Sequence, residues 1–269
     1  MQQADDFLAE TKALSTLVSP LSDDAYLQHT AFKGWTIDMV LRHLHFWNNA
    51  VLLSLKDEAA FGRLVEDLMG DLRAGTLTDF EHRYLDGLSG SALRSIWVAL
   101  AEEVAGAFGT IDPSARLPWV GPDMSARSSI TARLMETWAH GQEVYDQLGV
   151  PRANEDRIRN IVVLGVNTYG WTFRNRREDV PEPMPFVSLT APSGEIWTYG
   201  EENATERIDG AAEEFCQVVT QTRNIADTSL EVTGPNASAW MAKAQCFAGP
   251  AQDPPAPGTR TLRPLSEAD

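Results

Sequence analysis

Apolar side chains recur every three or four residues through the first two thirds of the chain, which is the spacing of one face of an α-helix. This pattern predicts five helices, in residues 7–18, 37–55, 89–108, 125–149 and 154–175. The fourth helix ends at Gly149 and Pro151, a common stop signal. Four long amphipathic helices joined by loops predict a helical bundle, and the fifth helix follows it.

Polar positions suggest where individual helices begin. Thr36 is a candidate N-cap for the second helix, and Ser89 or Ser91 for the third. The third helix should face the core with Leu93, Ile96, Trp97, Leu100 and Val104. We expect a charged connection between these two helices, and a loop in residues 111–123, which contain three prolines.

The pattern changes at residues 181–186, where Pro-Glu-Pro-Met-Pro-Phe is typical of a linker. Beyond it we predict two short strands in 186–200 around a Pro-Ser-Gly turn, a helix in 211–223, a strand in 228–234 and a helix in 237–249. The predicted fold is therefore mainly α, with a four-helix bundle followed by a small α+β domain. The expected domain limits are 1–178 and 184–250, and a proline-rich, loosely ordered tail occupies 251–269.

Composition narrows the classes of partner. Hydrophobic residues make up 43% of the 269 residues, so a sizeable core can be buried. The formal net charge of −16 argues against a nucleic-acid partner. No basic and apolar leader begins the chain, and no apolar run approaches the ~20 residues that span a bilayer, so we expect a cytoplasmic protein without a membrane partner. Cys216 and Cys246 form no CxxC pair and are expected to be two buried free thiols.

One pair of residues suggests metal chemistry. Glu136 and His140 are four apart on the fourth helix, so carboxylate and imidazole lie on one face and can converge on one ion. A third ligand must come from another helix, and either His43 or His45 on the second helix is a candidate, since the two point to opposite faces. Two histidines and a glutamate would leave a position for water or substrate, as in catalytic zinc sites. Taken singly, such residues are more often an ion pair and a core histidine.

Other catalytic and ligand-binding motifs are absent, or the residues that suggest them have simpler explanations. The chain has no HExxH, glycine-rich phosphate loop or GxSxG elbow. Trp97 and Trp138 fit core positions of their helices better than a ligand box. Arg133, three residues before Glu136, is most simply an ion-pair partner within the bundle, and a role in the pocket is the less favoured alternative.

Two longer motifs resemble a known family. Gly34-Trp35-Thr36 followed by His43-Leu44 resembles the start of the second helix in the DinB-like, maleylpyruvate isomerase N-terminal superfamily. Residues 119–125 and 131–142 resemble a metal-binding branch of that superfamily, related to mycothiol-dependent maleylpyruvate isomerases. The resemblance covers most of residues 1–175, and residues 186–248 resemble the small C-terminal domain of those isomerases.

The resemblance implies a site and a function. The metal triad of the family matches His43, Glu136 and His140, which selects His43 over His45, and the expected ion is divalent, with Zn²⁺ favoured. Arg223 occupies a place similar to that of an arginine that the isomerases use near the site. We expect S-transfer or cis–trans isomerisation of a small unsaturated acid with a thiol such as mycothiol, bacillithiol or glutathione. A non-catalytic metal-dependent binding protein and a metal-dependent hydrolase stay open as alternatives, as does a homodimeric state.

Overall fold

The computed structural model describes residues 1–263 and divides into two compact units, Met1–Gln147 and Leu148–Asp269. The first unit is almost entirely helical, and the second combines a small sheet with short helices. The predicted fold class, mainly α with a helical bundle before a small α+β part, is confirmed. The domain limits expected from the sequence stay a prediction.

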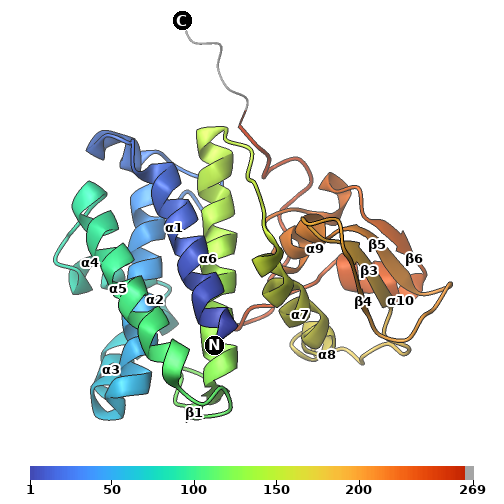
Figure 1. The fold of residues 1–269 in the computed structure, drawn as a ribbon, viewed down its shortest axis with the longest axis horizontal. Coiled ribbons are helices and arrows are strands. Elements are labelled where there is room, and N and C mark those ends of the chain that lie inside the picture. The colour runs from blue at the N-terminus through green and yellow to red at the C-terminus, as the bar shows by residue number, and fades with distance from the viewer. Residues whose placement is uncertain (264–269) are drawn as a thin grey trace, which may run out of the picture. The chain divides into compact units, whose positions relative to one another are not determined.

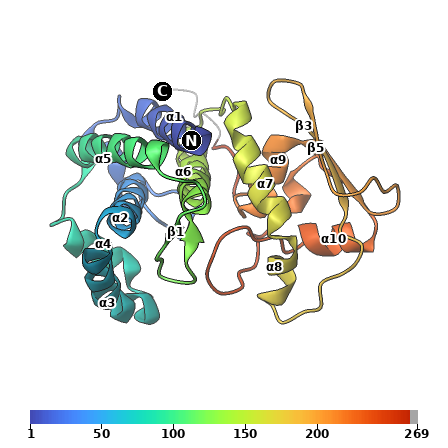
Figure 2. The same ribbon diagram turned by 60° about the horizontal axis from the view of Figure 1, so that its bottom comes forward.

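Four long helices form the bundle of the first unit (Figures 1 and 2): α1 (Gln2–Val18), α2 (Ile37–Lys56), α5 (Gly90–Thr110) and α6 (Ala126–Leu148). One core cluster draws residues from all four helices, including the fully buried Phe7, Val51, Phe108 and Leu134. The predicted Trp97 and Trp138 also lie in the core, each with 0% exposure. The apolar periodicity therefore places the bundle correctly.

Caps and stop signals define the ends of these helices. The side chain of Thr36 accepts a hydrogen bond from the Met39 amide at 3.2 Å, as an N-cap should. The helix α6 ends before Gly149. The φ of this glycine is +67°, which is incompatible with a right-handed helix. The side chain of Ser89 makes no capping bond at the start of α5, and Ile96 is 38% exposed instead of facing the core.

The start of α5 is held by aspartates from earlier in the chain. The Gly90 amide donates to Asp38 at 2.7 Å, and the Ser91 amide donates to Asp23 at 3.0 Å. Both carboxylates satisfy amides that the first turn of a helix leaves unbonded. Asp38 also pairs with Arg42 one turn later on α2, so a single buried side chain connects α2 to α5.

The expected charged connection between α2 and α5 is in fact two helices, α3 (Glu58–Ala74) and α4 (Leu77–Tyr84). Asp57 caps α3 by accepting from the Ala60 amide at 2.9 Å. Phe61, Leu64 and Leu68 pack in a second core cluster with residues of α2. The predicted proline loop likewise contains a short strand, β1 (Arg116–Leu117), paired antiparallel with β2 (Met124–Ser125).

The second unit contains a four-stranded sheet of order β4-β3-β5-β6. Its strands β3 and β4 form the predicted hairpin, while β5, which was not predicted, lies parallel to β3 and antiparallel to β6. The predicted fifth helix is broken into η2, α7 and α8. The bounds are η2 (Asp156–Ile158), α7 (Arg159–Asn167), α8 (Tyr169–Arg174), β3 (Phe186–Thr190), β4 (Ile196–Tyr199), β5 (Arg207–Ala211), α9 (Ala212–Val219), η3 (Ile225–Asp227), β6 (Glu231–Thr233) and α10 (Pro235–Met241).

Buried side chains hold this unit together. Val187 and Leu189 alternate into its core from β3, and Phe215 packs against Trp240 with ring centroids 5.7 Å apart. Cys216 and Cys246 are both free and buried, as the sequence predicts.

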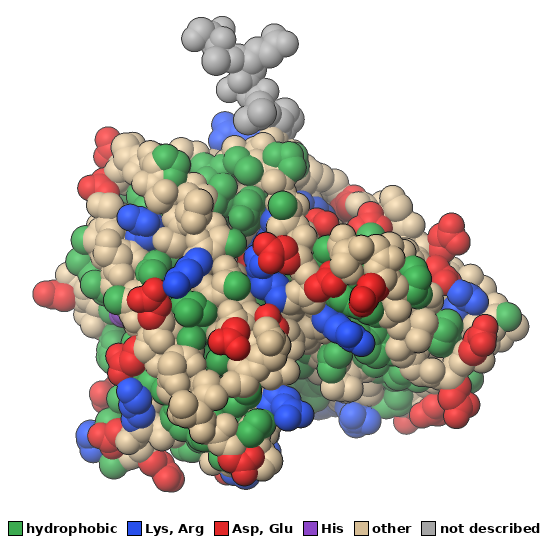
Figure 3. All heavy atoms as spheres, viewed as in Figure 1, with side chains coloured by type: hydrophobic (Ala, Val, Ile, Leu, Met, Phe, Trp, Pro, Cys, Tyr) green, Lys and Arg blue, Asp and Glu red, His purple; other side chains and the backbone are tan. Residues whose placement is uncertain are grey.

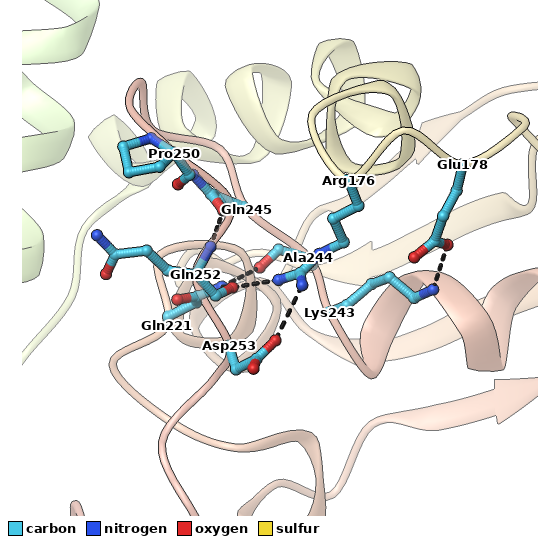
Figure 4. Close-up of polar contacts among 9 residues, drawn as sticks. All are labelled: Arg176, Glu178, Gln221, Lys243, Ala244, Gln245, Pro250, Gln252 and Asp253. Carbon is cyan, nitrogen blue, oxygen red and sulfur yellow. Dashed lines mark hydrogen bonds and ion pairs between the residues drawn. The ribbon is translucent and has the colours of Figure 1, made fainter.

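The proline-rich tail makes hydrogen bonds to the rest of the second unit as far as Arg260. Gln221 donates from Nε2 to the carbonyl of Gln252 at 2.9 Å, and the Gln252 amide donates to Gln245 at 2.9 Å (Figure 4). Arg260 donates to the Gln221 carbonyl at 2.7 Å. These bonds fix the tail to the second unit; the part of the predicted tail in residues 264–269 lies outside the described residues.

The surface carries both signs of charge. Figure 3 shows acidic and basic side chains interspersed over the face in view, without a large area of one sign. Among the described residues, none of the helices has the length and apolar character needed to cross a bilayer.

Replacing Asp38 tests the connection between α2 and α5. Asp38→Ala leaves the buried Arg42 without its carboxylate, so we expect a loss of about 3–5 kcal/mol in the free energy of unfolding of the first unit. Urea unfolding followed by tryptophan fluorescence measures it. The exposed Asp24→Ala is the control and should change little. A loss below about 1 kcal/mol for Asp38→Ala would contradict this role.

Candidate metal centre

The helices α2 and α6 bring together the three residues that the sequence singled out. Each of His43, Glu136 and His140 offers one ligand atom, and these atoms all lie within 4.8 Å of one another. Glu136 Oε2 lies 3.2 Å from His140 Nε2 and 3.8 Å from His43 Nε2. The carboxylate is therefore placed between two imidazoles, and both histidines present the same ring nitrogen to it. Metal ligation by these residues stays a prediction.

The two histidines are buried, while the carboxylate is partly open. His43 and His140 are each 8% exposed, whereas the side chain of Glu136 keeps 26% of its surface accessible. Access to the three ligand atoms is thus limited to the side of the carboxylate. An enclosed site of this kind strengthens electrostatic interactions within it.

A tight loop covers one side of the two histidines with aromatic rings. Trp35 stacks on His140 with centroids 5.5 Å apart, and Phe32 meets the same imidazole edge-on at 5.0 Å. The loop is closed by the Thr30 amide, which donates to the Trp35 carbonyl at 2.8 Å, and turns through Lys33, with φ of +52°. These rings fix the imidazole planes and exclude water from one side of the site.

Glu81 is a residue of the centre that the sequence did not reveal. It lies on α4, is 1% exposed, and its Oε1 is 2.8 Å from His43 Nδ1. The Nδ1–H of His43 can therefore donate to this carboxylate, so that when the imidazole is neutral its lone pair is on Nε2, which faces Glu136. Metal-binding histidines are commonly oriented by a carboxylate in this manner.

His45 takes no part in the centre. It follows His43 by two residues on α2, is half-buried, and burial lowers the pKa of its imidazole to about 4. It is therefore neutral at physiological pH. The sequence expectation that only one of the two histidines faces the site agrees with this placement.

Arg133 is not the ion-pair partner that the sequence suggested. It is 3% exposed, and its Nε donates to Asn48 Oδ1 at 3.2 Å. Among the described residues, no carboxylate oxygen lies within 4.0 Å of its guanidinium. A buried cation without a close counter-ion is unusual, because desolvating a charge is costly.

Arg223 lies in the second unit, a few residues after α9. It is 9% exposed, and its Nη1 donates to the carbonyl of Thr222 at 2.8 Å. Its expected role at the metal centre stays a prediction.

The protonation states of the centre depend on its two carboxylates. Burial lowers the pKa of His43, but the charge of Glu81 and contacts with Glu136 outweigh burial and raise that pKa to about 9. Burial raises the pKa of Glu136, but contacts with His140 and His43 hold it well below its usual range. Burial keeps the pKa of His140 below its ordinary value. Without a metal, the centre thus holds one extra proton on His43 at neutral pH.

A family model described as the mycothiol maleylpyruvate isomerase N-terminal domain matches residues 7–145, just over half of the chain. The chain belongs to this family. The matched segment contains α2 and α5, most of α1 and α6, and the three residues of the centre. The resemblance drawn from the sequence motifs is thereby confirmed.

Relatives in this family extend over nearly the whole chain. Two uncharacterized proteins of Mycobacterium tuberculosis, Rv0036c of strain ATCC 25618 / H37Rv and MT0041 of strain CDC 1551 / Oshkosh, are each 36% identical over 245 residues. The alignment covers 91% of this chain and 95% of each relative. A crystal structure of the mycothiol-dependent maleylpyruvate isomerase gives a TM-score of 0.49 at 16% identity, covering 81% of this chain and 87% of that one. The crystal structure of a mutant of that enzyme gives a TM-score of 0.49 at 15% sequence identity.

The donor set in this member of the mycothiol maleylpyruvate isomerase N-terminal family fits a divalent ion. Two imidazole nitrogens and one carboxylate oxygen are the ligands that catalytic zinc sites use, and three protein ligands leave a position open. His43 is already oriented by Glu81, so its Nε2 needs no rearrangement to accept an ion.

The first prediction for this centre concerns pH. Because the pKa of His43 is raised to about 9, an incoming ion must displace about one proton below that pH. We expect Zn²⁺ affinity to rise about tenfold per pH unit from pH 7 towards 9, with matching proton release. In the metal-free protein the same raised pKa stabilises the fold below pH 6.5, and that stability is lost as the pH passes 9. Calorimetry in buffers of different ionisation enthalpy measures the protons, and a pH-independent affinity would refute this assignment.

The second prediction concerns Glu81. At pH 9, where proton competition at His43 is small, Glu81→Gln should weaken Zn²⁺ binding about 10–100-fold, because the amide orients the imidazole less well. Towards pH 7 the difference should shrink, since the variant also loses the charge that holds a proton on His43. A chelator competition measures both affinities. The exposed Glu66→Gln on α3 is the matched control. Equal affinities at pH 9 would rule out positioning by Glu81.

Proposed function

We propose that this protein is a divalent-metal-dependent enzyme that uses a low-molecular-weight thiol for cis–trans isomerisation or S-transfer on a small unsaturated acid. The observation that carries the proposal is the convergence of two imidazoles and one carboxylate within 4.8 Å. Membership in the mycothiol maleylpyruvate isomerase N-terminal family supports mycothiol as the first thiol to test, with bacillithiol and glutathione as alternatives.

His43, Glu136 and His140 would hold the ion, and Zn²⁺ is the ion that this donor set favours. When bound, the ion supplies a Lewis acid that favours the thiolate form of a thiol at neutral pH. Glu81 keeps His43 in the tautomer with a free Nε2. Trp35 and Phe32 exclude water beside His140, which protects a thiolate from reprotonation.

The proposed isomerisation needs no net redox change. The thiolate sulfur forms a bond to one carbon of the conjugated double bond, and the displaced electron pair moves onto the conjugated carbonyl. The former double bond is now single and can rotate. Return of the electron pair expels the thiolate, so the trans acid forms and the thiol is regenerated. With an electrophile that carries a leaving group, the same sulfur attack would end in S-transfer.

Arg223 is proposed to bind a carboxylate of the substrate or the thiol. A planar guanidinium can bind a carboxylate through two parallel hydrogen bonds. The support for this role is the sequence resemblance.

The hydrolase alternative needs a free carboxylate as base near bound water. Glu136 contacts both histidines, and Glu81 is bonded to His43, so both carboxylates of the centre are already engaged. The geometry therefore favours a thiol reagent over hydrolysis. A non-catalytic binding protein would use the same metal ligands. A measurement of turnover distinguishes it from an enzyme.

Metal analysis and a thiol panel test this function together. The purified protein should carry about one divalent ion per chain, lost in His43→Ala, Glu136→Ala and His140→Ala but kept in His45→Ala. Mycothiol, bacillithiol and glutathione are then compared by thermal shift and by isomerisation of maleylpyruvate. We expect one thiol to raise the melting temperature of the metal-loaded protein and to support turnover.

Three outcomes would overturn the proposal. Unchanged metal content in the three ligand variants would show that the site is misassigned. Stabilisation by acids with no thiol effect and no turnover would indicate a binding protein. Ester or amide cleavage without added thiol would indicate a hydrolase.

A further inference from the structure

Three buried N–H donors next to the metal centre have no acceptor among the described residues. They are Trp47 Nε1, Asn48 Nδ2 and Arg133 Nη2. Buried donors in native proteins are nearly always bonded, so three together require an explanation. All three lie on α2 and α6, the helices that also carry His43 and Glu136.

The donors adjoin the metal ligands along both helices. Arg133, Glu136 and His140 follow one another at spacings of three and four residues, which places them on one face of α6. On α2, Trp47 is one turn after His43, and the two rings have centroids 6.2 Å apart. The bond from Arg133 Nε to Asn48 Oδ1, 3.2 Å long, joins the two helices at this level.

This cluster offers hydrogen-bond donors but no free acceptor among its own groups. A guanidinium, an indole N–H and an amide NH₂ are donors only, and the amide oxygen of Asn48 is already used by Arg133. Arg133 Nε is bonded to Asn48, whereas Nη2 at the end of the guanidinium is buried and has no partner among the described residues. The free end of the guanidinium is the edge that binds a carboxylate through two hydrogen bonds.

The charge of the centre also calls for an anion. Glu136 and Glu81 are the two carboxylates that act electrostatically on Arg133. With both histidines neutral, two carboxylates and one guanidinium leave one negative charge, which a bound divalent ion would reverse to one positive charge. In an enclosed site this excess favours a bound anion over water.

We propose that Arg133, Trp47 and Asn48 form a carboxylate-binding subsite beside the open position of the metal centre. The ligand class is a small organic acid, whose carboxylate accepts the three unused hydrogen bonds. This inference rests on the proposed function for the metal centre, but it places the acid-binding arginine on the bundle itself rather than at Arg223. Arg133 is then retained for binding, at a cost in stability.

The test uses the full chain loaded with Zn²⁺ and no thiol. Maleate, a four-carbon unsaturated dicarboxylate, is titrated by calorimetry, and the neutral maleamide serves as the uncharged analogue. We expect maleate to bind and maleamide not to. Arg133→Gln should weaken maleate binding about 10–100-fold, as expected for loss of charge-assisted hydrogen bonds, with the Zn²⁺ content unchanged. Arg127→Gln, an exposed arginine on the same helix, should leave the affinity as it is.

Two further variants separate binding from folding. Trp47→Phe removes the indole N–H but keeps an aromatic ring, so it should weaken maleate binding about 3–10-fold without loss of structure. Arg133→Lys keeps the charge but not the planar fork and should also bind maleate less well. If Arg133→Gln fails to fold, the maleate affinities of Trp47→Phe and Arg133→Lys test the subsite instead. Without ligand, Arg133→Gln should melt no lower than the parent protein, because it removes a buried unpaired charge.

The outcomes distinguish this subsite from the proposed function. Equal maleate affinity in the parent, Arg133→Gln and Trp47→Phe proteins would overturn the subsite, as would absence of maleate binding to the parent. A lower melting temperature of Arg133→Gln with unchanged affinity would show a structural role only. Arg133-dependent maleate binding without any thiol-dependent turnover would keep the subsite and reject the enzyme function.

Discussion

The placement of Glu136 between two imidazoles is the constraint on which the chemistry of the bundle depends. Bringing a carboxylate and two histidines out of water is costly unless their charge is balanced. Glu81 and Glu136 raise the pKa of His43 to about 9, so a proton on this imidazole helps to balance their charge in the metal-free protein. A divalent ion at the proposed site would meet the same requirement. Proton and ion would then compete, and Glu81 would stabilise either one through the opposite nitrogen of His43.

The residues that surround His43, Glu136 and His140 fall into two groups. Trp35 and Phe32 close the side next to His140 with apolar rings. Trp47 and Arg133 occupy the next turn of each helix and bring buried donors without acceptors. One side of the centre thus excludes water, while the other offers hydrogen bonds to an anion. In the proposed site this asymmetry would orient a bound acid with its reactive group at the metal position and its carboxylate towards Arg133.

Much of the bundle was predictable because apolar periodicity survives in long helices. The pair Glu136 and His140 followed from helical spacing alone, but His43 could be chosen over His45 only from the resemblance. Glu81 was missed because α3 and α4 carry many charges, which dilute the apolar spacing that Phe61 and its neighbours do show. No local pattern marks a glutamate whose partner lies 38 residues earlier. The strand β5 was missed for a similar reason, since Arg207–Ala211 contains charged residues and a glycine.

The nature of the bound reagent follows from which groups are already engaged. A hydrolytic site needs one carboxylate free to take a proton from water, and here Glu136 and Glu81 are both committed to histidines. A thiol needs no such base, because the ion itself favours its deprotonated form. The unused capacity of the centre is instead in donors, at Arg133 and its neighbours on α2. With an ion bound at the proposed site, the described residues would leave an open metal position and spare donors but both carboxylates engaged, which would suit a nucleophilic thiol and an anionic substrate.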